Sequence, residues 1–306
     1  MYSFFYDVFF ILKRRERKIC NKQSYQAKTI KWLLGYIEAY YNLLVIKLYD
    51  KFPSKRIGVK KNKREQRIIV SLTTFPKRVN TVWITIETLL RQTVKPDEVI
   101  LWLAKSQFDD ISVLPQKLVN LQKRGLTIRF CDELRSHKKY FYVMQEYPED
   151  IIVLADDDMF YPSDTLRKLI KMHKKYPKDI CTMTSQVIEP SFETKPSMWR
   201  NPKLGERFVH SEKVQIFTGS GSLYPPGSLD KTAFRKDLIK DLCPYADDLW
   251  LTFMANRKGT KITSWFPWRA FPITIYGTSE ETLWHINAAD GKNDDQWEAM
   301  LNYFKE

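Results

Sequence analysis

Residues 150–158 read DIIVLADDD and hold the strongest indication of how this chain folds. The apolar run within residues 150–155 is short and rich in β-branched side chains, which is typical of a strand buried on both faces. It leads directly into Asp156, Asp157 and Asp158. The segment therefore predicts a buried strand that delivers three adjacent carboxylates to the loop at its end.

Three apolar runs before this segment predict strands of the same kind, at residues 68–72, 99–103 and 126–130. Helices are predicted between them, one after the candidate cap Asn80 and one over residues 140–147. Strands that alternate with helices predict an α/β fold with a mostly parallel central sheet flanked by helices. Ligands of such sheets bind beyond the carboxyl ends of the strands, so the loops after Leu72 and Ala155 are expected to line the site.

The positive charge of the chain is concentrated at its N-terminus. Residues 1–67 hold 17 Lys and Arg against 5 Asp and Glu, whereas residues 68–306 hold 33 against 31. A nucleic-acid enzyme would carry positive charge across the body that grips the phosphates, so no nucleic-acid partner is expected. Charge beside apolar stretches favours an anionic membrane surface as the partner.

Two apolar stretches in this basic region, residues 1–12 and 30–48, predict interfacial amphipathic helices. Glu38 interrupts the second stretch and argues against a helix that spans the bilayer. The alternative is that the second helix packs on the rest of the protein. Residues 51–67 are polar and charged without an apolar period, which predicts a linker. The extension at residues 1–67 is therefore expected to be helical, basic and membrane-associating.

The aspartate triplet predicts a metal site. Adjacent carboxylates repel one another and are costly to bury unless a cation compensates their charge. Oxygen ligands favour Mg²⁺ or Mn²⁺, and such an ion can bridge carboxylates to a diphosphate. The alternative is an acidic turn that precedes the next helix.

Three segments together carry a resemblance to a known family: IIVSLTTFPKR at residues 68–78, DIIVLADDDMFYPSDTL at 150–166 and YADDLWL at 245–251. They resemble family-2-like glycosyltransferases of the GT-A fold, in order over residues 68–306. The resemblance implies a nucleotide-sugar-binding part at residues 68–190 and an acceptor-binding part of the same domain at 191–306.

The resemblance also implies roles for individual residues. Those expected to bind the nucleotide sugar are Thr73, Thr74, Arg78, Asp156 and Asp157. The metal ligands are expected to be Asp156 and Asp158, with His285 as the one histidine late enough in the chain to join them. Lys138 and the adjacent Lys139 precede the aspartate strand and are candidates to meet the diphosphate, unless both are ordinary exposed lysines.

A second acidic pair, Asp247 and Asp248, opens an apolar helical stretch that ends near Gly259. Transfer with inversion needs a carboxylate that takes the proton from the acceptor hydroxyl. The resembled family has Glu-Asp at this position, so Asp248 is expected to be the base and Asp247 to orient the acceptor. Capping of the helix is the alternative. Earlier in the chain, the small residues 219–222 predict either a loop that lets a sugar approach the backbone or a plain turn.

These features predict a metal-dependent, inverting glycosyltransferase, with a hexosyltransferase expected. The donor is a nucleotide sugar, with a UDP-sugar favoured, and the acceptor is a glycan or a lipid-linked molecule. Synthesis of a bacterial cell-surface polysaccharide or lipopolysaccharide is the expected setting, and the expected location is the cytoplasm, peripheral at the inner face of the plasma membrane. The alternatives are a metal-dependent phosphoesterase and a sugar-nucleotide nucleotidyltransferase.

Overall fold

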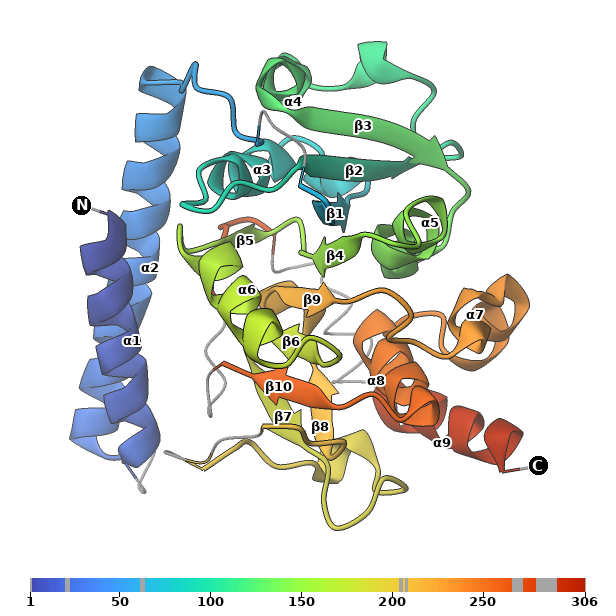
Figure 1. The fold of residues 1–306 in the computed structure, drawn as a ribbon. Helices are drawn as coiled ribbons and strands as arrows, with labels where there is room; N and C mark the ends of the chain where they lie inside the picture. Colours follow the sequence, from blue (N-terminus) through green and yellow to red (C-terminus); the bar gives the residue numbers. More distant parts are fainter. Residues whose placement is uncertain are drawn as a thin grey trace.

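A computed structural model describes residues 2–19, 23–60, 64–203, 206, 209–265, 272–278 and 291–305. A seven-stranded sheet forms the centre of the body, in the order β10-β6-β9-β4-β1-β2-β3 (Figure 1). Its strands are β1 (Ile68–Thr73), β2 (Glu98–Ala104), β3 (Leu126–Cys131), β4 (Ile151–Leu154), β6 (Ile180–Thr182), β9 (Ser222–Tyr224) and β10 (Ile262–Ser264).

The sheet is mostly parallel. β1 pairs in parallel with β2 and with β4, β2 with β3, and β6 with β10. β9 is the exception: it lies between β4 and β6 and runs antiparallel to both. Leu154 at the end of β4 therefore faces Ser222 at the start of β9. The predicted α/β fold is confirmed, and the loop before β9 enters at the edge where the aspartates leave β4.

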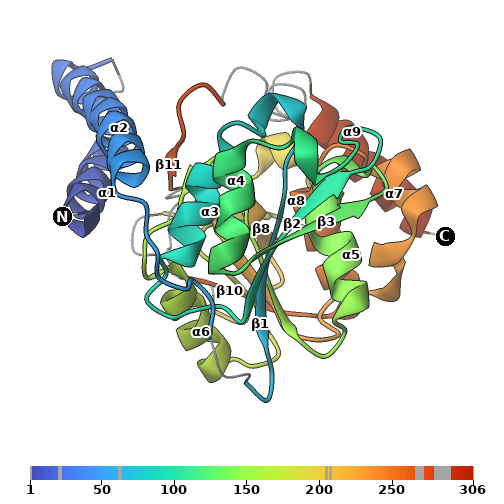
Figure 2. The ribbon, with the colours of Figure 1, turned by 90° about the horizontal axis from the view of Figure 1, so that it is seen from above.

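Helices cover both faces of the sheet (Figures 1 and 2). Side chains alternate along β1, so that Val70 joins one core and Ile69 the other. The helices of the body are α3 (Val82–Leu90), α4 (Gln116–Asn120), α5 (Lys138–Glu146), α6 (Thr165–Lys175), α7 (Lys236–Leu242), α8 (Asp247–Lys258) and α9 (Lys292–Phe304). The cap of α3 is Thr81, one residue after the predicted Asn80, and its side chain makes no capping hydrogen bond.

Two small antiparallel sheets complete the body. β5 (Met159–Phe160) pairs with β11 (Ile273–Thr274), and β7 (Ser185–Val187) pairs with β8 (Val214–Ile216). β5 follows the aspartate triplet directly. Its partner β11 comes from near the end of the chain, so this pairing brings a C-terminal segment to the aspartate loop.

The N-terminal region is a helical hairpin of α1 (Tyr2–Lys18) and α2 (Tyr25–Lys51), which lies along one side of the body (Figures 1 and 2). One face of α2 is buried and packs on the body, where Tyr41 meets the ring of Phe160 edge-on at 5.2 Å. This face of α2 therefore packs on the rest of the protein, which was the alternative to membrane contact for the second helix. Among the residues that the structure describes, no helix combines the length and the hydropathy needed to cross a bilayer.

The opposite face of α2 is exposed and aromatic. Its exposed apolar side chains include a set spaced at one or two helical turns along one stripe, which we call the aromatic stripe: Tyr25, Trp32, Tyr36, Tyr40 and Leu43. Trp32 and Tyr36 are 65% and 64% exposed, and their rings lie 5.5 Å apart. This helix therefore has one face in the core and one exposed, mostly aromatic face.

Ionic contacts fix the end of the hairpin and the following linker to the body. The buried Glu87 of α3 accepts hydrogen bonds from Arg91 and from Arg124. Arg91 also lies over the ring of Tyr49 in α2, at 4.5 Å from the centroid, and Arg124 donates through Nε to the carbonyl oxygen of Arg56 in the linker at 2.9 Å. The hairpin therefore has a defined position on the described body.

Candidate active site

Buried hydroxyl groups hold the main chain of the aspartate triplet. The hydroxyl of Tyr161 accepts a hydrogen bond from the amide of Asp156 at 2.8 Å and donates to the carbonyl oxygen of Gly219 at 2.9 Å. Thr85 of α3 contacts the carbonyl oxygens of Asp157 and Met159 at 2.9 and 3.0 Å. The triplet is therefore a fixed turn between β4 and β5.

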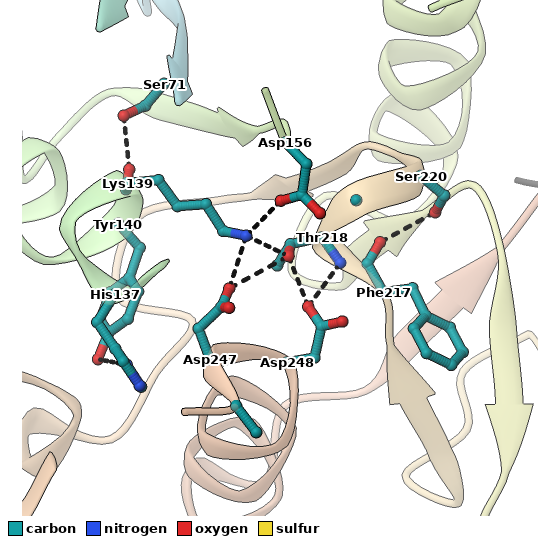
Figure 3. A network of polar contacts seen from close by, with 12 residues as sticks. Ser71, His137, Lys139, Tyr140, Asp156, Phe217, Thr218, Ser220, Asp247 and Asp248 are labelled. Atoms are coloured by element: carbon teal, nitrogen blue, oxygen red, sulfur yellow. Dashed lines mark hydrogen bonds and ion pairs between the residues drawn. The ribbon is translucent and has the colours of Figure 1, made fainter. Parts of the chain in front are cut away.

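The ammonium group of Lys139 lies at the centre of the polar network (Figure 3). Its Nζ is 2.5 Å from Asp156 Oδ1, 2.8 Å from Asp247 Oδ2 and 2.7 Å from Thr218 Oγ1. The side chain is only 3% exposed. Burial by itself would lower the pKa of Lys139, but the nearby carboxylates outweigh it and raise that pKa well above its ordinary value. Lys139 is therefore a permanent cation that links the two acidic clusters.

The sheet fixes the start of α5, from which Lys139 projects. Ser71 of β1 donates from Oγ to the carbonyl oxygen of Lys139 at 2.5 Å and accepts from Trp102 Nε1 at 3.0 Å. His137 lies just before the helix, with its Nε2 at 2.8 Å from the carbonyl oxygen of Cys243. Burial lowers the pKa of His137 to about 4, so this imidazole is neutral at physiological pH. The cation that links the two acidic clusters is therefore Lys139 and not His137.

Both lysines at the start of α5 are buried, which corrects the expectation of exposed lysines as the default. Their side chains diverge because successive residues on a helix point about 100° apart. Lys138 Nζ pairs with Glu133, at 2.8 Å from Oε1 and 2.7 Å from Oε2. The structure therefore brings Lys139 to the aspartates, and Lys138 is not among the residues that it places there.

Asp247 and Asp248 lie in the first turn of α8, as the sequence predicts, but their environments differ. Burial would raise the pKa of Asp247, yet Lys139 holds it below its ordinary value. For Asp248, burial and the negative charge of Asp247 raise the pKa to about 7. Asp247 is therefore the ionised partner of Lys139, and Asp248 exchanges a proton near neutrality.

One oxygen of Asp248 is fixed and the other is not. Oδ1 accepts from the amide of Thr218 at 2.9 Å and from its hydroxyl at 2.5 Å. Within the part of the chain that the structure describes, Oδ2 has no hydrogen-bond partner (Figure 3). A carboxylate held in this way can accept a proton at Oδ2 without losing its orientation.

The residues after β1 lie against the aspartates. Thr74 is buried and donates to Asp157 Oδ2 at 2.5 Å, whereas the hydroxyl of Thr73 donates to the carbonyl oxygen of Trp102 at 2.8 Å. Arg78 Nη1 lies 2.6 Å from Asp157 Oδ1 and 3.1 Å from Asp158 Oδ2. Both oxygens of Asp157 are thus engaged, and this residue joins the loop after β1 to the aspartate turn.

Asp158 has the environment expected of a ligand for a hard cation. Its Oδ1 is buried and has no hydrogen-bond partner among the described residues. Burial raises the pKa of Asp158 to about 7 although Arg78 opposes the shift. A divalent cation would compensate this carboxylate, so Asp156 and Asp158 fit Mn²⁺ or Mg²⁺ that keeps several positions for water and phosphate.

Further protein ligands are not found near these two aspartates in the described ranges, where no three His, Cys, Asp or Glu side chains form a group able to hold a metal. The predicted ligand His285 lies outside the described residues. Its role, like those of the other predicted site residues, stays a prediction.

Residues 72–232, more than half of the chain, match the sequence profile of Glycosyl transferase family 2. This chain belongs to that family. The match agrees with the resemblance seen in the motifs of the chain. A comparison with curated proteins by sequence found no match.

This chain is similar to two solved structures. TarS 1–349 from S. aureus is 12% identical, with a TM-score of 0.42 over 65% of this chain and 58% of that one, and it has also been solved with UDP and with UDP-GlcNAc. The mannosyltransferase PcManGT from Pyrobaculum calidifontis, solved with GDP-Man and Mn²⁺, is 14% identical, with a TM-score of 0.42 over 74% of this chain and 64% of that one. This chain spans less than two thirds of either structure.

Two residues of the site were given no role from the sequence: Thr218 and Tyr161. The predicted small-residue loop at 219–222 begins directly after Thr218, and the structure shows how closely its first residue, Gly219, approaches the aspartate turn. A Cβ atom at Gly219 would lie 2.4 Å from Asp156 Oδ2. Glycine therefore lets the loop before β9 lie against the aspartate turn without displacing the Asp156 carboxylate.

We therefore expect Gly219→Ala to displace the Asp156 carboxylate from Lys139 and to lower the free energy of unfolding by about 1–3 kcal/mol. Urea denaturation followed by circular dichroism measures this change. Gly35→Ala is the control, because Gly35 is an exposed helix residue with no atom within 4 Å of its added Cβ. The control should stabilise the protein by about 0.5–1 kcal/mol. Equal effects of the two substitutions would contradict the close approach at Gly219.

Proposed function

We propose that this glycosyltransferase moves a sugar, a hexose by expectation, from a nucleotide-sugar donor to an acceptor hydroxyl, with inversion and with Asp248 as the base. The observation that carries the proposal is the state of Asp248. Its pKa is raised to about 7, one of its oxygens is fixed by Thr218, and the other is available to a substrate. A base works best when its pKa lies near the operating pH.

In the proposed reaction the acceptor oxygen attacks the anomeric carbon of the donor. The new bond joins that carbon to the acceptor oxygen, and the bond from the carbon to the diphosphate breaks. Asp248 Oδ2 takes the proton of the acceptor hydroxyl. Asp247, paired with Lys139 at 2.8 Å, keeps its charge and orients the start of α8.

Asp156 and Asp158 are the residues that would hold Mn²⁺ or Mg²⁺. When bound, such an ion neutralises the charge that grows on the diphosphate leaving group. Arg78, which already contacts Asp157 and Asp158, adds a fixed positive charge at this edge of the site. Thr73 and Thr74 are proposed to lie beside the nucleoside, with a UDP-sugar as the favoured donor.

We expect the reaction rate to depend on the ionisation of Asp248. The base must be deprotonated, so kcat/KM should fall about tenfold for each pH unit below 7 and level off above it. Release of UDP or GDP from a panel of nucleotide sugars with Mn²⁺ measures the rate. Asp248→Asn should lower it at least about a hundredfold and remove the rise with pH.

Asp241→Asn is the matched control, because Asp241 is an exposed carboxylate on α7, the helix before α8. This variant should keep the wild-type rate and pH profile. If Asp248→Asn kept the wild-type dependence of kcat/KM on pH, Asp248 would not be the base.

We also propose that the enzyme acts at the cytoplasmic face of the plasma membrane, on a glycan or lipid-linked acceptor of a surface polysaccharide or lipopolysaccharide. Two features support this location. The aromatic stripe leaves Trp32 and Tyr36 exposed, and aromatic rings favour the interface between headgroups and acyl chains. Residues 1–67 carry the charge excess that attracts anionic lipids.

Sedimentation with lipid vesicles tests this proposal. The wild type should bind vesicles that contain phosphatidylglycerol and should bind neutral phosphatidylcholine vesicles weakly. The double variant Trp32→Glu/Tyr36→Glu should bind the anionic vesicles about tenfold more weakly, because it loses apolar contact and adds negative charge. Met198→Glu, at an exposed apolar side chain outside the hairpin, should bind as the wild type does. Equal binding by all three proteins would refute docking through the aromatic stripe.

A further inference from the structure

Asn42 is a buried polar residue in the middle of α2, and most of its partners lie outside that helix. Its side chain is 2% exposed. Nδ2 donates to the carbonyl oxygen of Thr274 and to that of Glu38, both at 3.0 Å, and Oδ1 accepts from the amide of Tyr276 at 2.9 Å. The amide group therefore bonds to the main chain on both sides of Ile275, as a neighbouring strand would.

The same segment contacts the aspartate turn from its other side. Thr274 pairs with Met159 in the small sheet of β5 and β11. The amide of Ile275 donates to the carbonyl oxygen of Asp158 at 2.8 Å. Residues 272–278 therefore lie between Asn42 and the main chain of a candidate metal ligand.

This segment also orients Arg78. The carbonyl oxygen of Thr278 accepts from Arg78 Nη2 at 2.8 Å, while Nη1 contacts Asp157 and Asp158. Thr278 is itself held by its hydroxyl, which donates to the carbonyl oxygen of Ile275 at 2.6 Å. Hydrogen bonds and the main chain of residues 274–278 thus connect Asn42 to the guanidinium group of Arg78.

We infer that Asn42 is a positioning residue of the donor site, so that α2 is part of the active-site framework as well as an anchor. The inference rests on the proposed function. Asn42 holds residues 272–278 in place, and these residues hold the Asp158 main chain and Arg78. A buried amide that lacked these partners would be costly, because each lost hydrogen bond leaves a buried polar group unsatisfied.

The chemistry of the side chain makes this role specific. The position requires a donor toward Thr274 and an acceptor toward Tyr276. Aspartate has nearly the same shape but cannot donate when ionised, and its second oxygen would face two carbonyl oxygens. Leucine has a similar volume and can make neither bond. If Asn42 only fills space in the core, leucine should replace it without loss. If Asn42 positions residues 272–278, both Asn42→Asp and Asn42→Leu should lose that function.

Isothermal titration of UDP and GDP, each with Mn²⁺, separates positioning from stability. The proteins are the wild type, Asn42→Asp, Asn42→Leu and the control Val45→Ala. Val45 is fully buried on the same side of α2, so its truncation weakens packing of the helix without removing a hydrogen bond to residues 272–278. Melting temperatures of all four proteins are measured alongside.

Both Asn42 variants should bind the preferred nucleotide about tenfold more weakly than the wild type, because misplacement of site groups by about 1 Å has effects of this order or larger. Val45→Ala should keep the wild-type affinity even if its melting temperature falls as far as those of the two Asn42 variants. Asn42 variants with the affinity of Val45→Ala would overturn the inference and leave the proposed function standing. A wild type that binds neither nucleotide would overturn both.

Discussion

The site depends on one buried cation. Lys139 lies within hydrogen-bonding distance of Asp156 at the end of β4 and of Asp247 at the start of α8, and Thr218 joins the same group from the loop before β9. Without this ammonium group, the buried Asp247 carboxylate would be unpaired beside the half-buried Asp156, and an unpaired buried carboxylate costs several kcal/mol. Lys139 thereby separates two functions: it keeps Asp247 ionised and leaves Asp248 to titrate near neutrality.

The N-terminal hairpin is joined to this chemistry through a single helix with two faces. Its exposed face carries the aromatic stripe, and its buried face carries Asn42, which holds the segment that contacts Asp158 and Arg78. Because Glu87, Arg91 and Arg124 also fix the end of the hairpin, the orientation of the aromatic stripe relative to the site is defined. An enzyme that works on a membrane-linked acceptor would need such a fixed relation.

Much of the fold could be predicted from the sequence, because β1 to β4 are contiguous apolar runs whose length and composition are diagnostic. β6, β9 and β10 have three residues each, too few for a periodic pattern, and the antiparallel direction of β9 follows from tertiary pairing. The acidic pairs could be found because carboxylates after a strand or at a helix start are conspicuous. The choice between Lys138 and Lys139 could not be made, since the two are identical neighbours. The rotation of α5 is set by tertiary contacts, such as the hydrogen bond from Ser71 to the Lys139 carbonyl oxygen. Asn42 gave no signal because its partners lie 232 and 234 residues away.

The proposed site at Asp156–Asp158 should bind a nucleotide sugar together with a divalent cation. Thermal-shift titration of UDP and GDP, with and without Mn²⁺, tests it on the wild type and on Asp156→Ala/Asp158→Ala. One nucleotide should raise the melting temperature of the wild type only when Mn²⁺ is present, and the double variant should show no such rise. A wild type that neither nucleotide stabilises, or a double variant stabilised as much as the wild type, would refute binding at this site.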